Sequence, residues 1–192
     1  MNNIDFIFIG DSLTFGYGVH KEQSWVYNIQ RELSLSSLNK ACNGDTSTGI
    51  LSRYYRDVIK YSPKNIFIMC GTNDLLMGKK TKDIIDNLEL MIKDSLDINA
   101  KIILGIPPNI IGSMAEKLFM PSSFYNYTEE ELPYLQSEII NLCSKYNISY
   151  IDFYKITWNK RDLYLDGIHL NSEGNDLMFK SFLKHLSNDF IK

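Results

Sequence analysis

Short apolar runs recur along the chain and are separated by longer segments with a different hydrophobic spacing. Four runs are almost continuously apolar, and each is bounded by Gly, Pro, Asn or charge: residues 4–9, 65–70, 101–106 and 148–153. Runs of this length are typical of strands that are buried on both faces of a sheet. A weaker strand is expected around "SLNKAC", residues 37–42. The pattern therefore predicts five short strands.

Between the strands, apolar residues recur at three- and four-residue spacing, which is the period of an α-helix. Helices are expected at residues 24–34, 47–61, 81–97 and 130–146, with Thr128 as a candidate N-cap of the last. A final helix is predicted after the N-cap residue Asn171, with an apolar face made of Leu177, Met178, Phe182, Leu183 and Leu186. Residues 107–129 are expected to form a long irregular connection of the kind that is usually functional or mobile.

Strand and helix alternate strictly along the chain, an arrangement typical of a parallel sheet covered by helices on both faces. The sequence therefore predicts an α/β fold, a three-layer α/β/α sandwich. The length of 192 residues and the hydrophobic content of 44% fit a single domain, residues 1–192, with one core.

Charge and cysteine content narrow the classes of function. The 20 Lys and Arg residues are balanced by 23 Asp and Glu, so the net charge of -3 gives no basic surface for nucleic acid or an anionic membrane. The first residues lack a basic region, and no apolar run reaches the length of a membrane span. Cys42, Cys70 and Cys143 are widely spaced, which predicts buried free thiols and neither a disulfide framework nor a zinc site. We therefore expect a cytoplasmic protein without stable membrane insertion or a nucleic-acid partner.

Polar residues gather directly after the predicted strands. Ligands of open α/β sheets bind outside the carboxyl ends of the strands, so these residues share one edge of the sheet. In chain order they are "GDS" (10–12), "NGDTS" (43–47), "GTND" (71–74), "PPN" (107–109) and "LYLDGIHLNSEG" (163–174). This edge therefore collects a serine, an amide and an Asp-x-x-His pair, which are the parts of a serine hydrolase.

Ser12, Asp166 and His169 have the chemistry of nucleophilic catalysis, although Ser12 read locally is equally well a turn residue. A serine hydroxyl is a weak nucleophile and needs a base within hydrogen-bond reach, which His169 can provide. Asp166 lies in a Gly-containing turn that can fold back onto the imidazole and hold its tautomer. The backbone N–H groups of Ser12 and Gly44 and the side-chain amide of Asn73 are candidate donors to an oxyanion.

On these residues the sequence resembles the GDSL or SGNH hydrolases, over nearly the whole chain and in the same order. The matching blocks are Gly10-Asp11-Ser12-Leu13, Gly44-Asp45-Thr46-Ser47, Gly71-Thr72-Asn73-Asp74 and Asp166-Gly167-Ile168-His169. The resemblance implies that Ser12 is the nucleophile, that His169 is the base and that Asp166 orients it. It also implies that Gly44 and Asn73 form the oxyanion hole together with the Ser12 N–H.

The resemblance further implies a flavodoxin-like parallel sheet of five strands in the order 2-1-3-4-5, with a shallow open site and no metal or organic cofactor. The implied function is that of a serine esterase or acylhydrolase, which cleaves acyl esters through an acyl-enzyme on Ser12. Thioester and lysophospholipid bonds are variants of the same substrate class. A carbohydrate O-acetylesterase or acyltransferase with the same triad remains an alternative, as does a flavodoxin-like binding module in which Ser12 only hydrogen-bonds a ligand. The expected partner is a small-molecule acyl ester.

Other polar residues near the motifs are assigned supporting roles. Asp11, Asp45 and Asp74 are expected to cap or brace loops through side-chain to backbone hydrogen bonds, and Asp11 and Gly71 to support the site. A phosphorylated Asp11 is disfavoured, because "DSLT" lacks the second acidic residue that such phosphatases use. A dinucleotide fingerprint is also disfavoured, because Lys21 stands where a third glycine is needed.

The connection at residues 107–129 carries several aromatic and Met side chains: Met114, Phe119, Met120, Phe124, Tyr125 and Tyr127. These side chains are expected either to form an acyl-binding wall or lid, or to pack down onto the sheet. The sequence pattern leaves both arrangements open.

Overall fold

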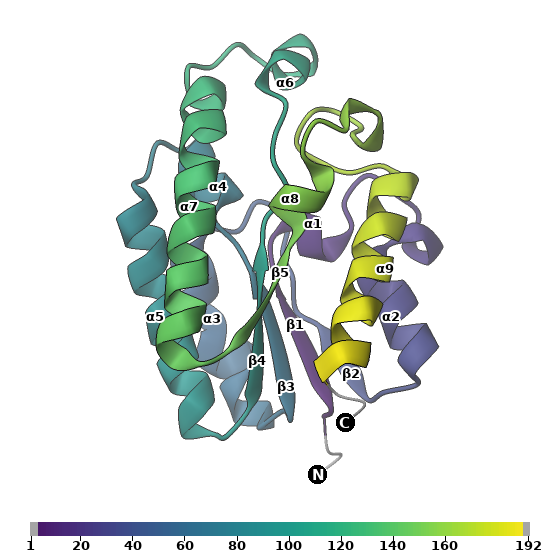
Figure 1. Cartoon of the computed structure of the whole chain (residues 1–192), viewed down its shortest axis with the longest axis vertical. Helices are drawn as coiled ribbons and strands as arrows, with labels where there is room; N and C mark the ends of the chain where they lie inside the picture. The colour runs from purple at the N-terminus through teal and green to yellow at the C-terminus, as the bar shows by residue number, and fades with distance from the viewer. Residues whose placement is uncertain (1–3, 190–192) are drawn as a thin grey trace.

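The computed structural model describes residues 4–189, and within them the chain forms a five-stranded parallel sheet. The strands are β1 (Phe6–Gly10), β2 (Ser37–Asn39), β3 (Asn65–Met69), β4 (Lys101–Ile106) and β5 (Ser149–Asp152). They lie in the order β2-β1-β3-β4-β5, and neighbouring strands pair in parallel (Figure 1). The strands and their predicted order are therefore confirmed.

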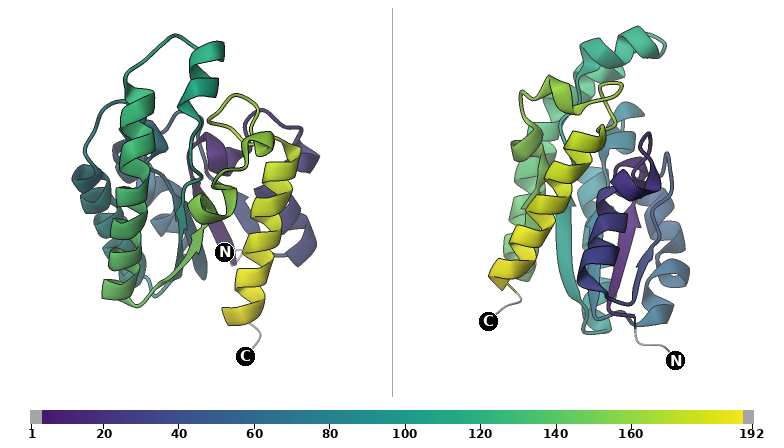
Figure 2. Two further views of the ribbon diagram at one scale, coloured as in Figure 1. Left: turned by 45° about the horizontal axis from the view of Figure 1, so that its top comes forward. Right: turned by 90° about the vertical axis from the view of Figure 1, so that its right-hand side faces the viewer.

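Long helices cover both faces of the sheet: α2 (Trp25–Leu33), α3 (Ser47–Asp57), α5 (Thr81–Asp97), α7 (Phe124–Tyr146) and α9 (Ser172–Asp189). Figures 1 and 2 show α3, α5 and α7 on one side of the sheet and α2 and α9 on the other. Successive strand residues alternate between these sides: Ile7 packs with the first group of helices and Phe8 with the second. The predicted three-layer sandwich is confirmed.

The side of the sheet that faces α2 and α9 has an aromatic core. The indole ring of Trp25 is fully buried and packs edge-on against Phe8 and Phe67, with ring centroids 5.9 and 5.2 Å away. Aromatic pairs of this geometry contribute about 0.5–1.5 kcal/mol beyond the burial of their area. The same indole donates its N–H to the Leu13 carbonyl oxygen at 2.9 Å. The aromatic core is thus connected directly to the turn that follows Ser12.

The expectation of an irregular connection at residues 107–129 is wrong. Helix α6 (Gly112–Leu118) lies within it, and α7 begins at Phe124, six residues before the predicted start at 130. Thr128 is therefore inside the helix and not its N-cap, and its hydroxyl donates to the Phe124 carbonyl oxygen at 2.7 Å. Tyr and Asn at the start of α7 are weak helix formers, and Pro133 interrupts its hydrogen-bond ladder, which explains why the sequence did not reveal its full length.

Smaller differences occur elsewhere. The helix predicted at 47–61 ends at Asp57 and is followed by a 3₁₀ turn, η2 (Ile59–Tyr61). Cys70 and Cys143 are buried free thiols as expected, whereas Cys42 is exposed. No helix in residues 4–189 is long and apolar enough to cross a bilayer. The N-cap prediction for the last helix is confirmed, because Asn171 Oδ1 accepts the N–H groups of Glu173 and Gly174 at 3.0 Å.

Candidate active site

Ser12 stands at the carboxyl end of β1, on the first residue of the short helix α1 (Ser12–Phe15). Asp11 caps this helix, because its Oδ1 accepts the Leu13 N–H at 2.9 Å. Gly16 ends the helix with a φ of 87°, a conformation that favours glycine. Ser12 is 6% exposed. A buried central strand thus fixes the position of the Ser12 hydroxyl at one edge of the sheet.

His169 and Asp166 reach Ser12 from the loop between the 3₁₀ turn η3 (Arg161–Leu163) and α9. The Nε2 atom of His169 lies 3.0 Å from Ser12 Oγ, and its Nδ1 atom lies 2.7 Å from Asp166 Oδ2. The other carboxylate oxygen, Oδ1, accepts the backbone N–H groups of Ile168 at 2.9 Å and His169 at 2.7 Å. The predicted Asp-x-x-His turn therefore does fold the carboxylate back onto the imidazole.

The hydrogen bonds of this turn determine the charge of Asp166. Partial burial acts to raise the pKa of its carboxyl group, but hydrogen bonds from the His169 ring and from the backbone of Ile168 and His169 outweigh it and lower the pKa below its usual value. The carboxylate is consequently ionised at neutral pH. An ionised partner at Nδ1 selects the tautomer of His169 that leaves Nε2 free to accept a proton from Ser12.

Gly44 and Asn73 come to the same edge from the segments that follow β2 and β3. Gly44 has a φ of 76°, and a Cβ atom placed on it would meet no atom within 4 Å, so the backbone here is open to an approaching group. Asn73 lies on α4 (Thr72–Leu76) and donates one amide N–H to the Asp45 carbonyl oxygen at 2.8 Å. The amide nitrogen carries a second N–H, which leaves one donor for another acceptor.

Asp74 connects the two segments that carry Gly44 and Asn73. Its fully buried carboxylate accepts the Ser47 N–H and hydroxyl, each at 2.8 Å, and contacts Lys79 Nζ at 3.2 Å. Gly71 precedes α4 with a φ of 123°, and a Cβ there would lie 2.7 Å from Leu135 Cδ2. Asp74 thus joins the two segments, and Gly71 allows Leu135 to pack close to the backbone.

Asp11 differs from the other carboxylates of the site. It is buried, and its Oδ2 has no hydrogen-bond partner among the described residues. Burial raises the pKa of Asp11 to about 7, against the opposing effect of the Leu13 N–H. The charges of Asp74 and Asp45 act in the same direction as burial, and that of His169 acts against it. Near neutral pH the group is therefore partly protonated.

Three contacts at the site were not predicted from the sequence, although Gly167 was expected to shape the turn of Asp166. The ring of Tyr17 lies 4.5 Å from that of His169, centroid to centroid. The buried hydroxyl of Tyr164 lies 2.6 Å from the backbone oxygen of Asn109 and 2.8 Å from its Oδ1, so it connects the loop of Asp166 to the end of β4. Gly167 permits close packing in that loop, because a Cβ would lie 2.5 Å from the Ile111 carbonyl oxygen.

The surface beside Ser12 is shallow. The hollow that includes Ser12, Tyr17 and His169 has a volume of about 10 Å³. A larger cavity of about 300 Å³ lies beyond Asn109, between that segment and Trp158, and shares no lining residue with the hollow.

Comparison with known proteins extends the similarity beyond the site. Residues 8–177 match the model of the GDSL-like Lipase/Acylhydrolase family. Two curated relatives are similar to this chain over 109 residues: an arylesterase from Vibrio mimicus at 31% identity and the esterase TesA from Pseudomonas aeruginosa at 30% identity. In both cases the similar region covers 53% of this chain and 54% of the relative, so the chain spans about half the length of these relatives.

Solved structures share the fold over nearly the whole chain. A crystal structure of TesA superposes with a TM-score of 0.80 at 20% identity and covers 96% of this chain and 98% of that one. An acetyl xylan esterase, AlAXEase, superposes with a TM-score of 0.80 at 20% identity and covers 95% of this chain and 100% of the other. At these identities the superpositions show a common fold.

Proposed function

The chain belongs to the GDSL-like lipase/acylhydrolase family, as its sequence blocks predict, and from this premise we propose that it is a serine esterase that hydrolyses acyl esters through an acyl-enzyme on Ser12. The observation that carries the proposal is the chain of contacts from Ser12 Oγ to His169 Nε2 at 3.0 Å and from His169 Nδ1 to Asp166 at 2.7 Å. Nucleophile, base and orienting carboxylate are thus within hydrogen-bond reach of one another.

In the proposed reaction Ser12 Oγ attacks the carbonyl carbon of the ester, and His169 Nε2 takes the hydroxyl proton. The negative charge that develops on the carbonyl oxygen is stabilised by the N–H groups of Ser12 and Gly44 and by the free amide N–H of Asn73. His169 then gives its proton to the alcohol oxygen as the carbon–oxygen bond breaks. A water molecule attacks the acyl-enzyme with the same proton transfers, which releases the acid and restores Ser12.

The acyl length of the substrate is decided by the ester panel below. The hollow beside Ser12 and His169 has a volume of about 10 Å³ and is lined by neither Gly44 nor Asn73, so it does not measure the acyl group. An O-acetylesterase acting on an acetylated sugar would use the same residues, and acyl transfer would follow if an alcohol replaced water in the second step. Four further points remain predictions from the sequence: activity on thioesters, activity on lysophospholipids, a cytoplasmic location and a single domain.

Labelling with a fluorophosphonate probe tests the proposal. We expect the native protein to be labelled on Ser12, Ser12→Ala to remain unlabelled, and His169→Ala to react slowly. A panel of p-nitrophenyl esters from acetyl to palmitoyl, with an acetylated sugar and an acyl-CoA, would then rank the substrates by acyl length and leaving group. A native protein that is neither labelled nor active on any ester would instead support the binding-module alternative.

A further inference from the structure

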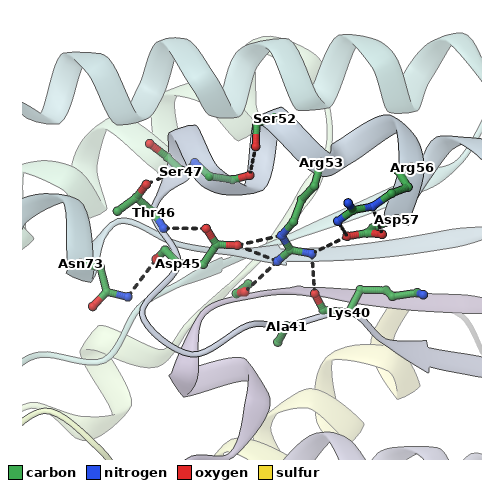
Figure 3. A network of polar contacts seen from close by, with 12 residues as sticks. Lys40, Ala41, Asp45, Thr46, Ser47, Ser52, Arg53, Arg56, Asp57 and Asn73 are labelled. Atoms are coloured by element: carbon green, nitrogen blue, oxygen red, sulfur yellow. Dashed lines mark hydrogen bonds and ion pairs between the residues drawn. The ribbon is translucent and has the colours of Figure 1, made fainter.

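Arg53 on α3 holds a network of polar contacts beside the loop that carries Gly44 (Figure 3). Its Nε and Nη2 atoms both lie 2.8 Å from Asp45 Oδ2. Its Nη1 donates to the Lys40 carbonyl oxygen at 2.7 Å, and its Nη2 lies 3.5 Å from the Gly10 carbonyl oxygen. One guanidinium group therefore contacts both ends of the loop at residues 40–45 and the backbone just before Ser12.

Asp45 links Arg53 to the two predicted oxyanion donors, Gly44 and Asn73. It is the residue next to Gly44, and its own carbonyl oxygen accepts the side-chain amide of Asn73 at 2.8 Å. Its Oδ1 accepts the Thr46 N–H at 3.0 Å, which leaves Oδ2 for Arg53. The side chains of Arg53 and Asp45 are only 14% and 13% exposed. A partly desolvated, two-contact ion pair of this kind is stronger and more directional than a surface pair.

Arg53 has a second carboxylate partner, Asp57, which its Nη1 atom contacts in addition to the Lys40 carbonyl oxygen. Asp57, one turn further along α3, accepts from Arg53 Nη1 at 2.9 Å. Hydrogen bonds from Arg56 and Arg53 lower the pKa of Asp57 to about 2, despite its partial burial, so it stays ionised at any pH at which an esterase works. Arg53 thus has one carboxylate partner directed at the site and one directed away from it, which provides an internal control.

We propose that Arg53 is a positioning residue for the oxyanion hole: through Asp45 it holds the Gly44 N–H and the Asn73 amide at the distance from Ser12 that the transition state requires. This inference rests on the proposed esterase function and deepens it. A lysine cannot replace it, because an ammonium group has no planar fork to contact Asp45 and the Lys40 carbonyl at the same time.

The proposal predicts a change in kcat with little change in KM. Displacing a catalytic group by about 1 Å costs on the order of 100-fold in rate, so Arg53→Ala is expected to lower kcat on p-nitrophenyl acetate by about 10- to 100-fold. KM should stay within about threefold, because the ground-state ester does not carry the oxyanion charge. Added guanidinium ion, at concentrations too low to denature, should restore part of the kcat of Arg53→Ala, and ammonium should not.

Two further variants separate positioning from stability. Asp57→Ala removes the partner that points away from the site, so it should lower the melting temperature as Arg53→Ala does and leave kcat within about threefold. Gly49→Ala leaves Arg53 intact but places a Cβ 1.9 Å from Asp45 Oδ1, which must then move. Because alanine is a better helix former than glycine, Gly49→Ala should fold well and still lose kcat, without rescue by guanidinium.

The outcomes distinguish this inference from the proposed function when Ser12→Ala is assayed in parallel. An active native protein whose kcat is unchanged in both Arg53→Ala and Gly49→Ala would overturn the role of Arg53 alone. An equal loss of kcat in Asp57→Ala and Arg53→Ala would also overturn it, because the effect would then follow stability. A native protein no more active than Ser12→Ala would overturn both proposals.

Discussion

The two sides of Ser12 are built in different ways. On the proposed acid–base side, Asp166 and His169 belong to one four-residue turn whose own backbone N–H groups bind the carboxylate. On the proposed oxyanion side, Gly44 and Asn73 come from separate segments and are joined by contacts between residues that are far apart in sequence, such as Asn73 with Asp45 and Asp74 with Ser47. The first side is a local structure, whereas the second is a product of the fold.

This difference determines where sensitive residues lie. The contacts between Asp166 and His169 lie within one turn, so substitutions outside residues 166–169 should disturb their chemistry less than substitutions within the turn. A site assembled from distant segments depends on residues that never touch substrate, and Arg53 is one of them. Substitutions on the acid–base side should therefore be severe and local, and those on the oxyanion side milder and more widely spread.

The largest effect is expected within the local turn. Asp166→Asn preserves the shape of the side chain but permits the wrong tautomer of His169, so kcat should fall by about 10,000-fold. The measurement is steady-state hydrolysis of p-nitrophenyl acetate. Asp162→Asn is a matched control, because Asp162 is exposed in the adjacent 3₁₀ turn and only its backbone oxygen is hydrogen-bonded to Asn171. A loss of less than tenfold in Asp166→Asn would argue against its assigned role.

A smaller effect is expected on the oxyanion side. Asn73→Ala removes one donor to the oxyanion, worth about 2.7 to 4 kcal/mol, and should lower kcat by about 100- to 1,000-fold while the protein stays folded. Circular dichroism and the melting temperature would check the fold, and Asn126→Ala, at an exposed position of α7, would serve as a control. An unchanged kcat would show that Asn73 only braces the Asp45 carbonyl.

The smallest effect on kcat, and the clearest effect of pH, is expected at Asp11, which lies between the two sides. Burial raises its pKa to about 7 from 3.8, so the folded protein binds this proton more tightly than the unfolded chain does. The stabilisation is therefore fully present below about pH 4 and is lost as the pH rises towards 7.

The side chain introduced by Asp11→Asn cannot ionise, so this variant should not lose that stabilisation as the pH rises. Its free energy of unfolding should rise relative to that of the native protein, by on the order of 3 kcal/mol between about pH 4.5 and pH 8. Urea unfolding of both proteins across that range measures the difference. Two curves that run parallel with pH would mean that Asp11 is ionised in the folded state throughout, as Asp166 is.

The sequence revealed the parts of the molecule that are set by local patterns. The five strands and the three-layer sandwich follow from buried apolar runs between amphipathic segments, whereas the strand order was implied by the family resemblance. The Asp166 to His169 contact follows from a short glycine-containing turn. The start of α7 was missed because its first residues are weak helix formers ahead of Pro133. Arg53 was missed because a charged residue on a helix is usually exposed to solvent, and the sequence does not show that the fold brings the Lys40 and Gly10 carbonyl oxygens next to it.

The two tryptophans give the molecule an intrinsic optical reporter. Trp158 is 51% exposed and open to collision with a soluble quencher, whereas Trp25 is fully buried and hydrogen-bonded to the carbonyl of Leu13. When iodide quenches Trp158, the remaining emission comes mainly from Trp25, whose indole is hydrogen-bonded to Leu13, the residue after Ser12. Spectral shifts of that emission would follow the state of the nucleophile turn in unlabelled protein, including while an acyl group is attached.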